Sequence, residues 1–476
     1  MVKVLGVGVL SYSNIEQSII SLEGDKVINL YASIESKPSI SWRKDTIIFD
    51  FYQCVSAQYN IENCMPIDGL LLDSMLSAEV IFLKMIERSD YQDRMSYYDR
   101  KSSYLNHLTY WNDHLKVNKP DCVIFYNFPH EMYDYVIYSL CKVMGIKVLI
   151  FDDINFCPDT LFLIESIEES AIEIRDKLKE IKMQGSDFQL KKLQVYLDDF
   201  NKQDASFSPK MINDLKEEQI QKGRILEQVK IVAKKILSVI KGDRKIFRRD
   251  FGIRYRPYMM FQERRLFSYY DKHSINTPDL NQKYIYLALH YQPECSSSPM
   301  GGHYVEQHLI ADLIAKNLPK GWFLYVKEHP LQKKHGRNVE LYKRLVKMEK
   351  VLLVSRNYPS INLIKKSIAV ATLTGTTGWE GFLTKKPVLK FGHSYYQYAP
   401  GVYKINSSND VKLAIKKIKN GTVITDTDIK QFLKAMELVS IDAWVLDFLK
   451  KPMTTLSNKE VVENISNALI KRLSLL

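Results

Sequence analysis

The sequence predicts an α/β protein with two domains, each built on a parallel β-sheet covered by helices. Its 476 residues are too many for a single hydrophobic core of ordinary size. Short apolar runs alternate with helical segments through the second half of the chain, a pattern typical of a doubly wound sheet. A hydrophobic fraction of 46% and a charged fraction of 26% are typical of a globular protein.

The first half contains one clear parallel unit. An apolar run at 120–127, a helical pattern at 129–145 and a second apolar run at 146–153 have the spacing of a strand, a crossover helix and a strand. The N-terminal stretch 2–9 predicts a first strand, because no basic region and cleavage site accompany it as in a signal peptide. Residues 70–117 predict a long helical region.

The second half repeats the strand and helix alternation more regularly. Five strands are predicted, at 283–290, 321–330, 351–355, 368–374 and 387–392. Two such domains followed by helices suggest a GT-B-like architecture, with the active site in the cleft at the carboxyl ends of the strands. The predicted boundaries are 1–164 for the first α/β domain, 165–279 for a charged helical segment, 280–425 for the second domain and 426–476 for the C-terminal helices.

The formal net charge of +12 favours an anionic partner. No zinc-finger or RNP motif is present, so we do not expect nucleic acid. Eleven Lys or Arg face four acids between Lys216 and Arg249, and apolar residues recur there at helical spacing. This basic helix predicts contact with an anionic inner-membrane surface. The alternative is a helix packed on its own protein, with a solvated basic face.

The six cysteines are scattered, with no C-x-x-C pair. They are interpreted as reduced residues of a cytoplasmic protein, and no zinc or other metal site is predicted. No apolar run reaches the roughly 18 residues of a membrane span.

A glycine- and threonine-rich turn follows the strand at 368–374. It reads VATLTGTTGWEG over 370–381, and a helix is expected to begin near Thr377. Free backbone N–H groups at a helix start, together with the helix dipole, bind anions. The turn therefore predicts a phosphate site, whereas the alternative is a plain connection between a strand and a helix.

Two further polar loops follow predicted strands. The loop at 290–302 contains Gln292 and Glu294, and the sequence KEHP at 327–330 contains His329. Each has an ordinary interpretation, as a polar turn or a loop histidine at the end of the sheet. Polar groups that recur at three strand ends favour a functional site at that edge.

These stretches together resemble the capsule polysaccharide biosynthesis family, which includes bacterial β-Kdo transferases. The resemblance rests on LHYQPE, VKEHP, TGTTGWEG and KKPVLKFG, and it is best over 284–403 and weak in the first domain. It implies a GT-B glycosyltransferase whose donor is a CMP-activated 2-keto sugar acid, with 280–425 as the nucleotide-sugar-binding domain.

The resemblance also implies roles for residues of two loops. The backbone N–H groups and hydroxyls at Thr374, Gly375, Thr376 and Thr377 would hold the phosphate without a metal, and Glu380 would contact the ribose. Three residues of the second loop would complete the donor site. They are His329 as a contact to phosphate or carboxylate, Pro330 as the residue that fixes the loop, and Lys327 as a second cation.

Candidates for the catalytic group lie in both domains. Retaining relatives have a carboxylate nucleophile just after the glutamine of the first loop, and here Glu294 follows Gln292 by two positions. The Asp of those relatives would fall at Cys295 or Ser296, so double displacement is in doubt. An inverting enzyme would need a base from the first domain. The candidates are His130, Glu131, Asp152 and Asp153.

The sequence therefore predicts transfer of a Kdo-like or nonulosonic acid from a CMP donor to a capsule or lipopolysaccharide glycan or glycolipid. The enzyme is expected to be cytoplasmic, with peripheral contact at the inner face of the membrane, and to need no cofactor. Two alternatives remain. One is an enzyme that uses a UDP-sugar, either a transferase or a UDP-N-acetylglucosamine 2-epimerase. The other is a non-catalytic capsule assembly or export factor.

Overall fold

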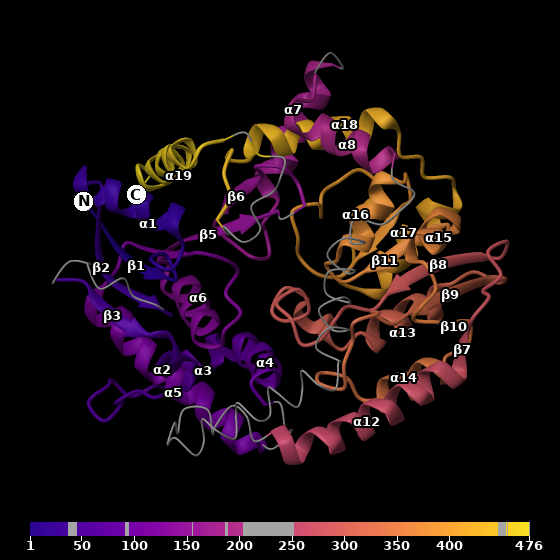
Figure 1. Ribbon diagram of the computed structural model, residues 1–476, viewed down its shortest axis with the longest axis horizontal. Helices are drawn as coiled ribbons and strands as arrows, with labels where there is room; N and C mark the ends of the chain where they lie inside the picture. Colours follow the sequence, from indigo (N-terminus) through magenta and orange to yellow (C-terminus); the bar gives the residue numbers. More distant parts are fainter. Residues whose placement is uncertain are drawn as a thin grey trace, which may run out of the picture.

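The computed structural model describes residues 1–36, 45–90, 95–154, 156–185, 189–202, 252–445, 454 and 456–475. The basic helix predicted between Lys216 and Arg249 lies outside these residues. Figure 1 shows two bodies of sheet and helices side by side, the first in indigo to magenta and the second mainly in orange. The two-domain α/β prediction is confirmed.

The first domain contains a six-stranded sheet of order β3-β2-β1-β4-β5-β6. Its first five strands are parallel, and β6 pairs antiparallel with β5. The strands are β1 (Val2–Val7), β2 (Ile28–Glu35), β3 (Ile47–Asp50), β4 (Cys122–Phe125), β5 (Lys147–Asp153) and β6 (Leu161–Ile164). The helices are α1 (Ser13–Gly24), α2 (Phe51–Val55), α3 (Gly69–Ser74), α4 (Leu76–Met85), η1 (Ile86–Arg88), α5 (Tyr97–Asn118) and α6 (Tyr133–Met144).

The second domain contains a seven-stranded parallel sheet of order β13-β12-β11-β8-β9-β10-β7. The strands are β7 (Ser274–Ile275), β8 (Lys283–Ala288), β9 (Trp322–Lys327), β10 (Val351–Val354), β11 (Ala369–Thr372), β12 (Val388–Lys390) and β13 (Val402–Lys404). The helices are η2 (Gly302–Val305), α13 (His308–Asn317), α14 (Val339–Lys347), α15 (Ser360–Lys366), α16 (Thr376–Leu383) and α17 (Ser408–Lys419).

Alternate residues of each strand face opposite sides of the sheet, and this divides the core. On β8, Ile285 and Leu287 pack into the cluster shared with α13, α14 and α17, whereas Tyr284 and Tyr286 pack into the cluster on the other face. Both faces of β8 are buried, as expected for a central parallel strand, and this explains its continuous apolar run.

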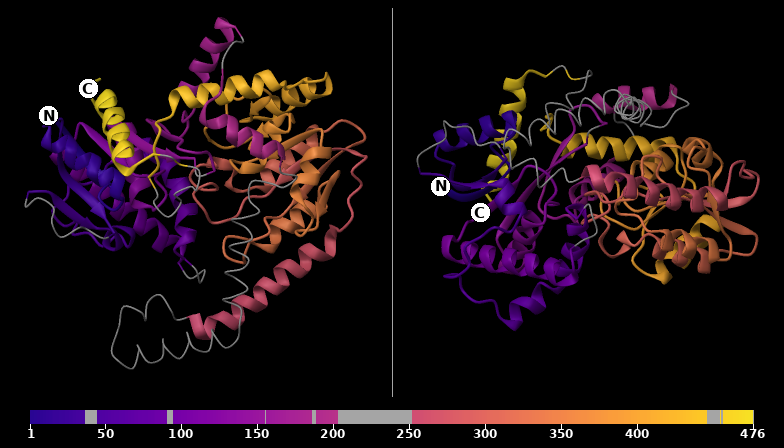
Figure 2. Two further views of the ribbon diagram at one scale, coloured as in Figure 1. Left: turned by 45° about the horizontal axis from the view of Figure 1, so that its top comes forward. Right: turned by 60° about the horizontal axis from the view of Figure 1, so that its bottom comes forward.

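Five further described helices accompany the two domains, and Figure 2 shows the whole fold from two more sides. They are α7 (Ile172–Gln184), α8 (Lys192–Lys202), α12 (Gly252–His273), α18 (Asp426–Val439) and α19 (Asn458–Leu473). The end of the chain returns to the first domain, where Ser18 of α1 donates a hydrogen bond to the Val462 carbonyl at 3.1 Å. The C-terminal helices of the predicted GT-B-like fold are therefore present.

The strand order reverses once in each sheet. In the second domain the chain runs outward from β8 to β9 and β10 on one side, and returns to β11, β12 and β13 on the other. Ligands of open parallel sheets bind outside the carboxyl ends of the strands at such a reversal. A ligand site is therefore expected at the carboxyl ends of β8 and β11. Within the described residues, no helix is both long and apolar enough to cross a bilayer.

Candidate functional site

The turn between β11 and α16 lies at this reversal, and its carbonyl groups are tied back into the domain. The Leu373 carbonyl accepts hydrogen bonds from Nζ of Lys390 at 3.2 Å and from the Gly392 N–H at 2.8 Å. The Tyr396 hydroxyl lies 3.3 Å from the Thr374 carbonyl and 2.6 Å from the Gly375 carbonyl. Three consecutive carbonyls therefore point into the protein.

The N–H groups of the same turn point the other way. The Thr374 N–H donates to Nε2 of His290 at 3.0 Å, but no described residue accepts from the N–H groups of Gly375, Thr376 or Thr377. No side chain caps α16, in contrast to α17, α18 and α19, which each begin with a reciprocal capping pair. Unpaired N–H groups at an uncapped helix start are the arrangement with which helices bind anions.

Close packing at His290 sets the shape of the turn. A Cβ atom on Gly375 would lie 2.7 Å from Nε2 of His290, so only glycine allows this approach. Burial, followed by the charges of Lys390 and other cations, lowers the pKa of His290 to about 3, so its Nε2 accepts the Thr374 N–H as a neutral imidazole. The LHYQPE motif contains His290, but sequence reasoning missed its role because the contact joins loops 84 residues apart.

Two of the predicted donor residues lie behind the turn rather than on it. Glu380 is 2% exposed and Lys327 is 4% exposed. The Lys327 ammonium donates to the Ser360 hydroxyl at 3.0 Å, and the carboxylate of Glu380 raises the pKa of Tyr286 and Tyr396, after burial. The ribose contact of Glu380 and the cationic role of Lys327 stay predictions.

The loop after β9 is held by a fully buried ion pair. Nε of Arg337 lies 2.8 Å from Oε2 of Glu328, and neither side chain is exposed. The Tyr342 hydroxyl donates to the same carboxylate at 2.6 Å. Arg337 also donates to the His290 carbonyl and to the Gln292 side-chain oxygen, so one guanidinium joins the loops after β8 and β9. Sequence reasoning missed both members of the pair.

His329 and Pro330 follow this ion pair at the edge of the sheet. The Leu331 N–H donates to Nδ1 of His329 at 3.2 Å, which leaves the hydrogen of the neutral ring on Nε2. Burial, together with the charges of Lys327 and Arg337 and against the opposing charge of Glu328, lowers the pKa of His329 to about 4. At neutral pH this ring is therefore an uncharged donor.

The loop after β8 separates the roles of its two predicted residues. The amide of Gln292 is 5% exposed and donates to the Val305 carbonyl at 2.9 Å, while its oxygen accepts from Arg337. Glu294 is exposed, and its carboxylate lies 3.5 Å from the Ser296 hydroxyl. Partial loss of contact with water raises the pKa of the Glu294 carboxyl, and the charge of Arg88 opposes the rise. Glu294 can reach a ligand directly, whereas Gln292 supports the loop.

The four candidates of the first domain also differ in which of their groups form contacts. The N–H groups of His130 and Glu131 donate to the carboxylate of Asp134, at 3.0 and 2.7 Å, so an acid that the sequence analysis did not consider shapes this turn. Asp153 accepts from the Val445 N–H at 3.0 Å. Asp152 is 7% exposed, and burial followed by the charge of Asp153 raises its pKa to about 7. Burial raises the pKa of the Cys295 thiol, and the charge of Asp152 adds to this rise from across the domain contact.

The two domains meet around these loops. Lys84 of α4 forms an ion pair with Glu306 at 2.8 Å, and Arg88 of η1 donates to the Ser298 carbonyl at 3.2 Å. A cavity of about 10 Å³, roughly the room for one water molecule, lies between η1 and the loop after β8. The predicted interdomain cleft is therefore nearly closed at this point.

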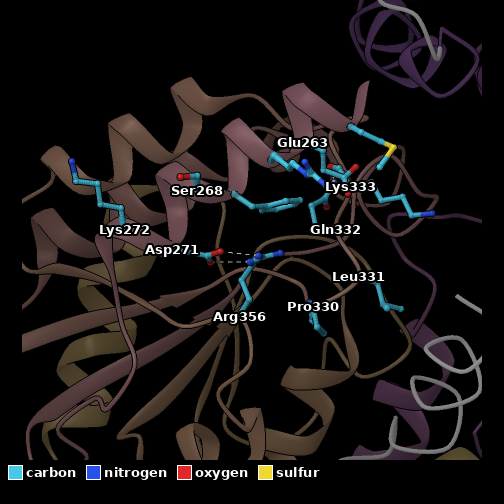
Figure 3. A pocket seen from close by; sticks show the side chains of 12 residues that line it. Glu263, Ser268, Asp271, Lys272, Pro330, Leu331, Gln332, Lys333 and Arg356 are labelled. Atoms are coloured by element: carbon cyan, nitrogen blue, oxygen red, sulfur yellow. Dashed lines mark hydrogen bonds and ion pairs between the residues drawn. The ribbon is translucent and has the colours of Figure 1, made fainter. Parts of the chain in front are cut away.

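A larger groove of about 910 Å³ lies beside the same loops. Figure 3 shows residues of α12 on one side of it, with Pro330 to Lys333 and Arg356 facing them. Arg356 forms a pair of hydrogen bonds with Asp271, at 3.1 and 2.9 Å. All of its lining residues belong to α12 and the second domain, so a ligand there would touch no first-domain candidate.

The structure thus brings together residues from the three loops of the second domain. Thr374 joins the turn to the loop after β8 through His290 and through a hydrogen bond from its hydroxyl to the Ser296 carbonyl at 2.7 Å. Arg337 joins that loop to the one after β9. Lys327 and Glu380 lie in the interior beneath these loops.

Comparison with known proteins supports the family resemblance. Residues 297–439 match the family model described as "Capsule polysaccharide biosynthesis protein", and this region contains the loop of His329 and the turn of Gly375. The resemblance predicted from the motifs is confirmed for this part of the chain. No curated protein sequence matches the chain.

Similar solved structures include three proteins. A β-Kdo 2,7-transferase, KpsC, from Thermosulfurimonas dismutans is 13% identical over 81% of this chain and 96% of its own, with a TM-score of 0.32. A glycosyltransferase from Rickettsia africae is 11% identical over 99% and 98%, with a TM-score of 0.27. A UDP-GlcNAc 2-epimerase from Neisseria meningitidis is 14% identical over 100% of both chains, with a TM-score of 0.22.

Proposed function

We propose that the protein is a glycosyltransferase of bacterial surface polysaccharide synthesis, and that its donor is a CMP-activated 2-keto sugar acid. The observation that carries this proposal is the turn before α16. Three N–H groups lack an acceptor among the described residues at the point where the strand order reverses, while the carbonyls of the turn accept hydrogen bonds from the rest of the domain. The family match over 297–439 covers this turn and connects it with capsule synthesis.

The proposed chemistry requires stabilisation of a leaving phosphate. When the bond between the sugar and CMP breaks, negative charge develops on the phosphate oxygen. The N–H groups of Gly375, Thr376 and Thr377, with the dipole of α16, are preorganised to receive that charge. The Nε2–H of His329 would add a neutral donor, because the Leu331 N–H occupies Nδ1. Protonation of this ring would become easier beside a bound anion.

Two carboxylates compete for the catalytic role. Glu294 is exposed on the loop after β8 and fits the position of a nucleophile in a retaining reaction. Asp152 comes from the first domain, and its raised pKa of about 7 suits a general base that deprotonates an acceptor hydroxyl in an inverting reaction. The effects of Glu294→Gln and Asp152→Asn on transfer would distinguish the two mechanisms.

A thermal-shift titration with CMP, CDP, UMP and UDP tests the proposed donor, since a ligand stabilises only the form that it binds. We expect CMP to raise the melting temperature of the wild type but not that of His329→Ala. His303→Ala is the control, because His303 is exposed on η2. A preference for UDP would favour a UDP-sugar enzyme, whose diphosphate the same N–H groups suit. The absence of any shift would favour a non-catalytic assembly factor.

A further inference from the structure

Arg88 lies between the two domains and donates hydrogen bonds to both. It ends η1 in the first domain, and its guanidinium donates through Nη1 to the His130 carbonyl at 2.7 Å and through Nη2 to the Ser298 carbonyl at 3.2 Å. One acceptor therefore lies on each side of the domain contact. Both acceptors are uncharged backbone groups.

The positive charge of Arg88 has no ion-pair partner among the described residues, and it acts on the nearby Glu294 carboxylate without a salt bridge. Neighbouring cations do have one, since Lys84 pairs with Glu87 and Glu306, and Arg100 pairs with Asp90. Arg88 forms no ion pair there, and its Nε is buried without a hydrogen-bond partner. Partly buried charges in proteins are normally paired, so an anionic ligand would supply what the protein does not.

Arg88 also lies close to the proposed phosphate site. It holds the Ser298 carbonyl, and the Thr374 hydroxyl of the α16 turn holds the Ser296 carbonyl at 2.7 Å. The two held carbonyls are two residues apart, a distance of at most about 7 Å along the chain. The guanidinium and the α16 turn therefore both contact the same short segment, and the charge of Arg88 opposes the rise in the pKa of Glu294 in that segment's loop.

We propose that Arg88 binds the carboxylate of the donor sugar and thereby selects sugar acids over neutral sugars. This inference rests on the proposed function. In a CMP-activated 2-keto sugar acid, the phosphate oxygen and the carboxylate are attached to the same carbon, so the donor needs two anion sites side by side. Arginine has five N–H donors in a planar fork that matches a carboxylate, and only two are used here.

The small cavity sets a condition for binding. Arg88, Gln292, Pro293, Ser298 and Gly336 line it, and its volume of about 10 Å³ does not admit a sugar ring. The donor must therefore widen the contact between η1 and the loop after β8. The hydrogen bond from Arg88 to Ser298 would then be exchanged for one to the carboxylate, so Arg88 would contact the donor from the first domain.

The test compares the dissociation constants of CMP and of CMP-sugar acids by calorimetry. The probes are CMP-N-acetylneuraminic acid and CMP-Kdo, and the variants are Arg88→Gln and Arg88→Lys. Lys84→Ala is the matched control, because it removes another cation that crosses the domain contact. We expect Arg88→Gln to weaken the better CMP-sugar acid by about 10- to 100-fold and to leave CMP within about twofold. Arg88→Lys should retain part of the affinity, and the control should leave the ratio of the two constants unchanged.

Three results would overturn the inference. Equal weakening of CMP and CMP-sugar acid in Arg88→Gln would mean that Arg88 contacts the phosphate or only supports the fold. Unchanged binding of both would mean that it contacts neither group. Either result, with CMP bound by the wild type, would overturn the role of Arg88 and leave the proposed function standing. If the wild type bound no cytidine nucleotide at all, the proposed function would fail with it.

Discussion

At the scale of single residues, the site depends on side chains that keep other groups in place. Tyr396 and Lys390 hold carbonyls, and His290 holds one N–H. None of the three needs to touch a ligand. Their combined effect is to leave the N–H groups of Gly375, Thr376 and Thr377 unpaired, which is the condition for anion binding at a helix start.

Tyr396 and its neighbour Tyr395 form a natural pair for testing this arrangement. The Tyr396 hydroxyl donates to the turn, whereas the buried Tyr395 hydroxyl has no hydrogen-bond partner in the structure. We expect Tyr396→Phe to destabilise the protein by about 1–3 kcal/mol, because buried carbonyls lose a donor, and to weaken CMP binding. Tyr395→Phe should have little effect on either. Equal effects of the two variants in urea unfolding and CMP titration would contradict the assigned role.

Asp152 gives a prediction about pH. In the folded protein its pKa is about 7, whereas an unfolded aspartate ionises near pH 4. The folded state therefore keeps a proton that the unfolded state loses, and the stability that depends on this proton falls as pH rises from about 4 to about 7. Asparagine cannot ionise, so we expect the stability of Asp152→Asn relative to the wild type to increase over that range and stay constant above it.

Two measurements check this prediction. Unfolding midpoints of wild type and Asp152→Asn between pH 4 and pH 8 test the pKa, and a difference that does not change with pH would contradict it. Transfer assays test the base. If Asp152 is the base, Asp152→Asn loses transfer at every pH but still binds CMP. Full transfer by the variant would leave Glu294 as the catalytic acid.

At the scale of elements, the loops after β8 and β9 depend on one close approach. Gly336 has a φ of +74°, and a Cβ on it would lie 2.7 Å from the backbone of Gln292 and Pro293. Gly321 has a similar φ of +77°, but a Cβ there would meet nothing within 4 Å. The two glycines therefore separate backbone strain from contact between the loops.

We expect Gly321→Ala to cost roughly 1–2 kcal/mol through its left-handed backbone alone. Gly336→Ala should cost more, and it should also reduce stabilisation by CMP, because it displaces Gln292 and the loop that contains Glu294. Denaturant unfolding and thermal-shift titration measure the two effects. Equal losses in the two variants, with nucleotide binding intact, would show that the loop contact does not position the site.

The regular elements of the second domain could be predicted because their apolar runs are long and their turns are marked by Gly and Pro. The edge strands β3, β7 and β13 could not, since none of their residues is fully buried and they form no long apolar run. The same limit applies to the site. The GTTG turn and the KEHP loop are local motifs, whereas the pair Glu328–Arg337 and the contact between His290 and Thr374 join distant positions.

At the scale of the whole molecule, the domain contact places two kinds of group across from one another. The second domain supplies the N–H groups of α16, the neutral His329 and Glu294. The first domain supplies Asp152 and Arg88, the latter in direct contact with the second domain. Under the proposed function, the second domain would hold the donor phosphate, while the first domain would hold the donor carboxylate through Arg88 and activate the acceptor through Asp152.

The central claim is that the turn before α16 binds the phosphate of CMP. Amide chemical shifts of Gly375, Thr376 and Thr377, followed by NMR in protein labelled at glycine and threonine, test it most directly. We expect CMP to shift these three amides strongly and cytidine, which lacks the phosphate, to leave them unchanged. If CMP binds the protein and leaves all three amides unmoved, the phosphate lies elsewhere and the proposed site is wrong.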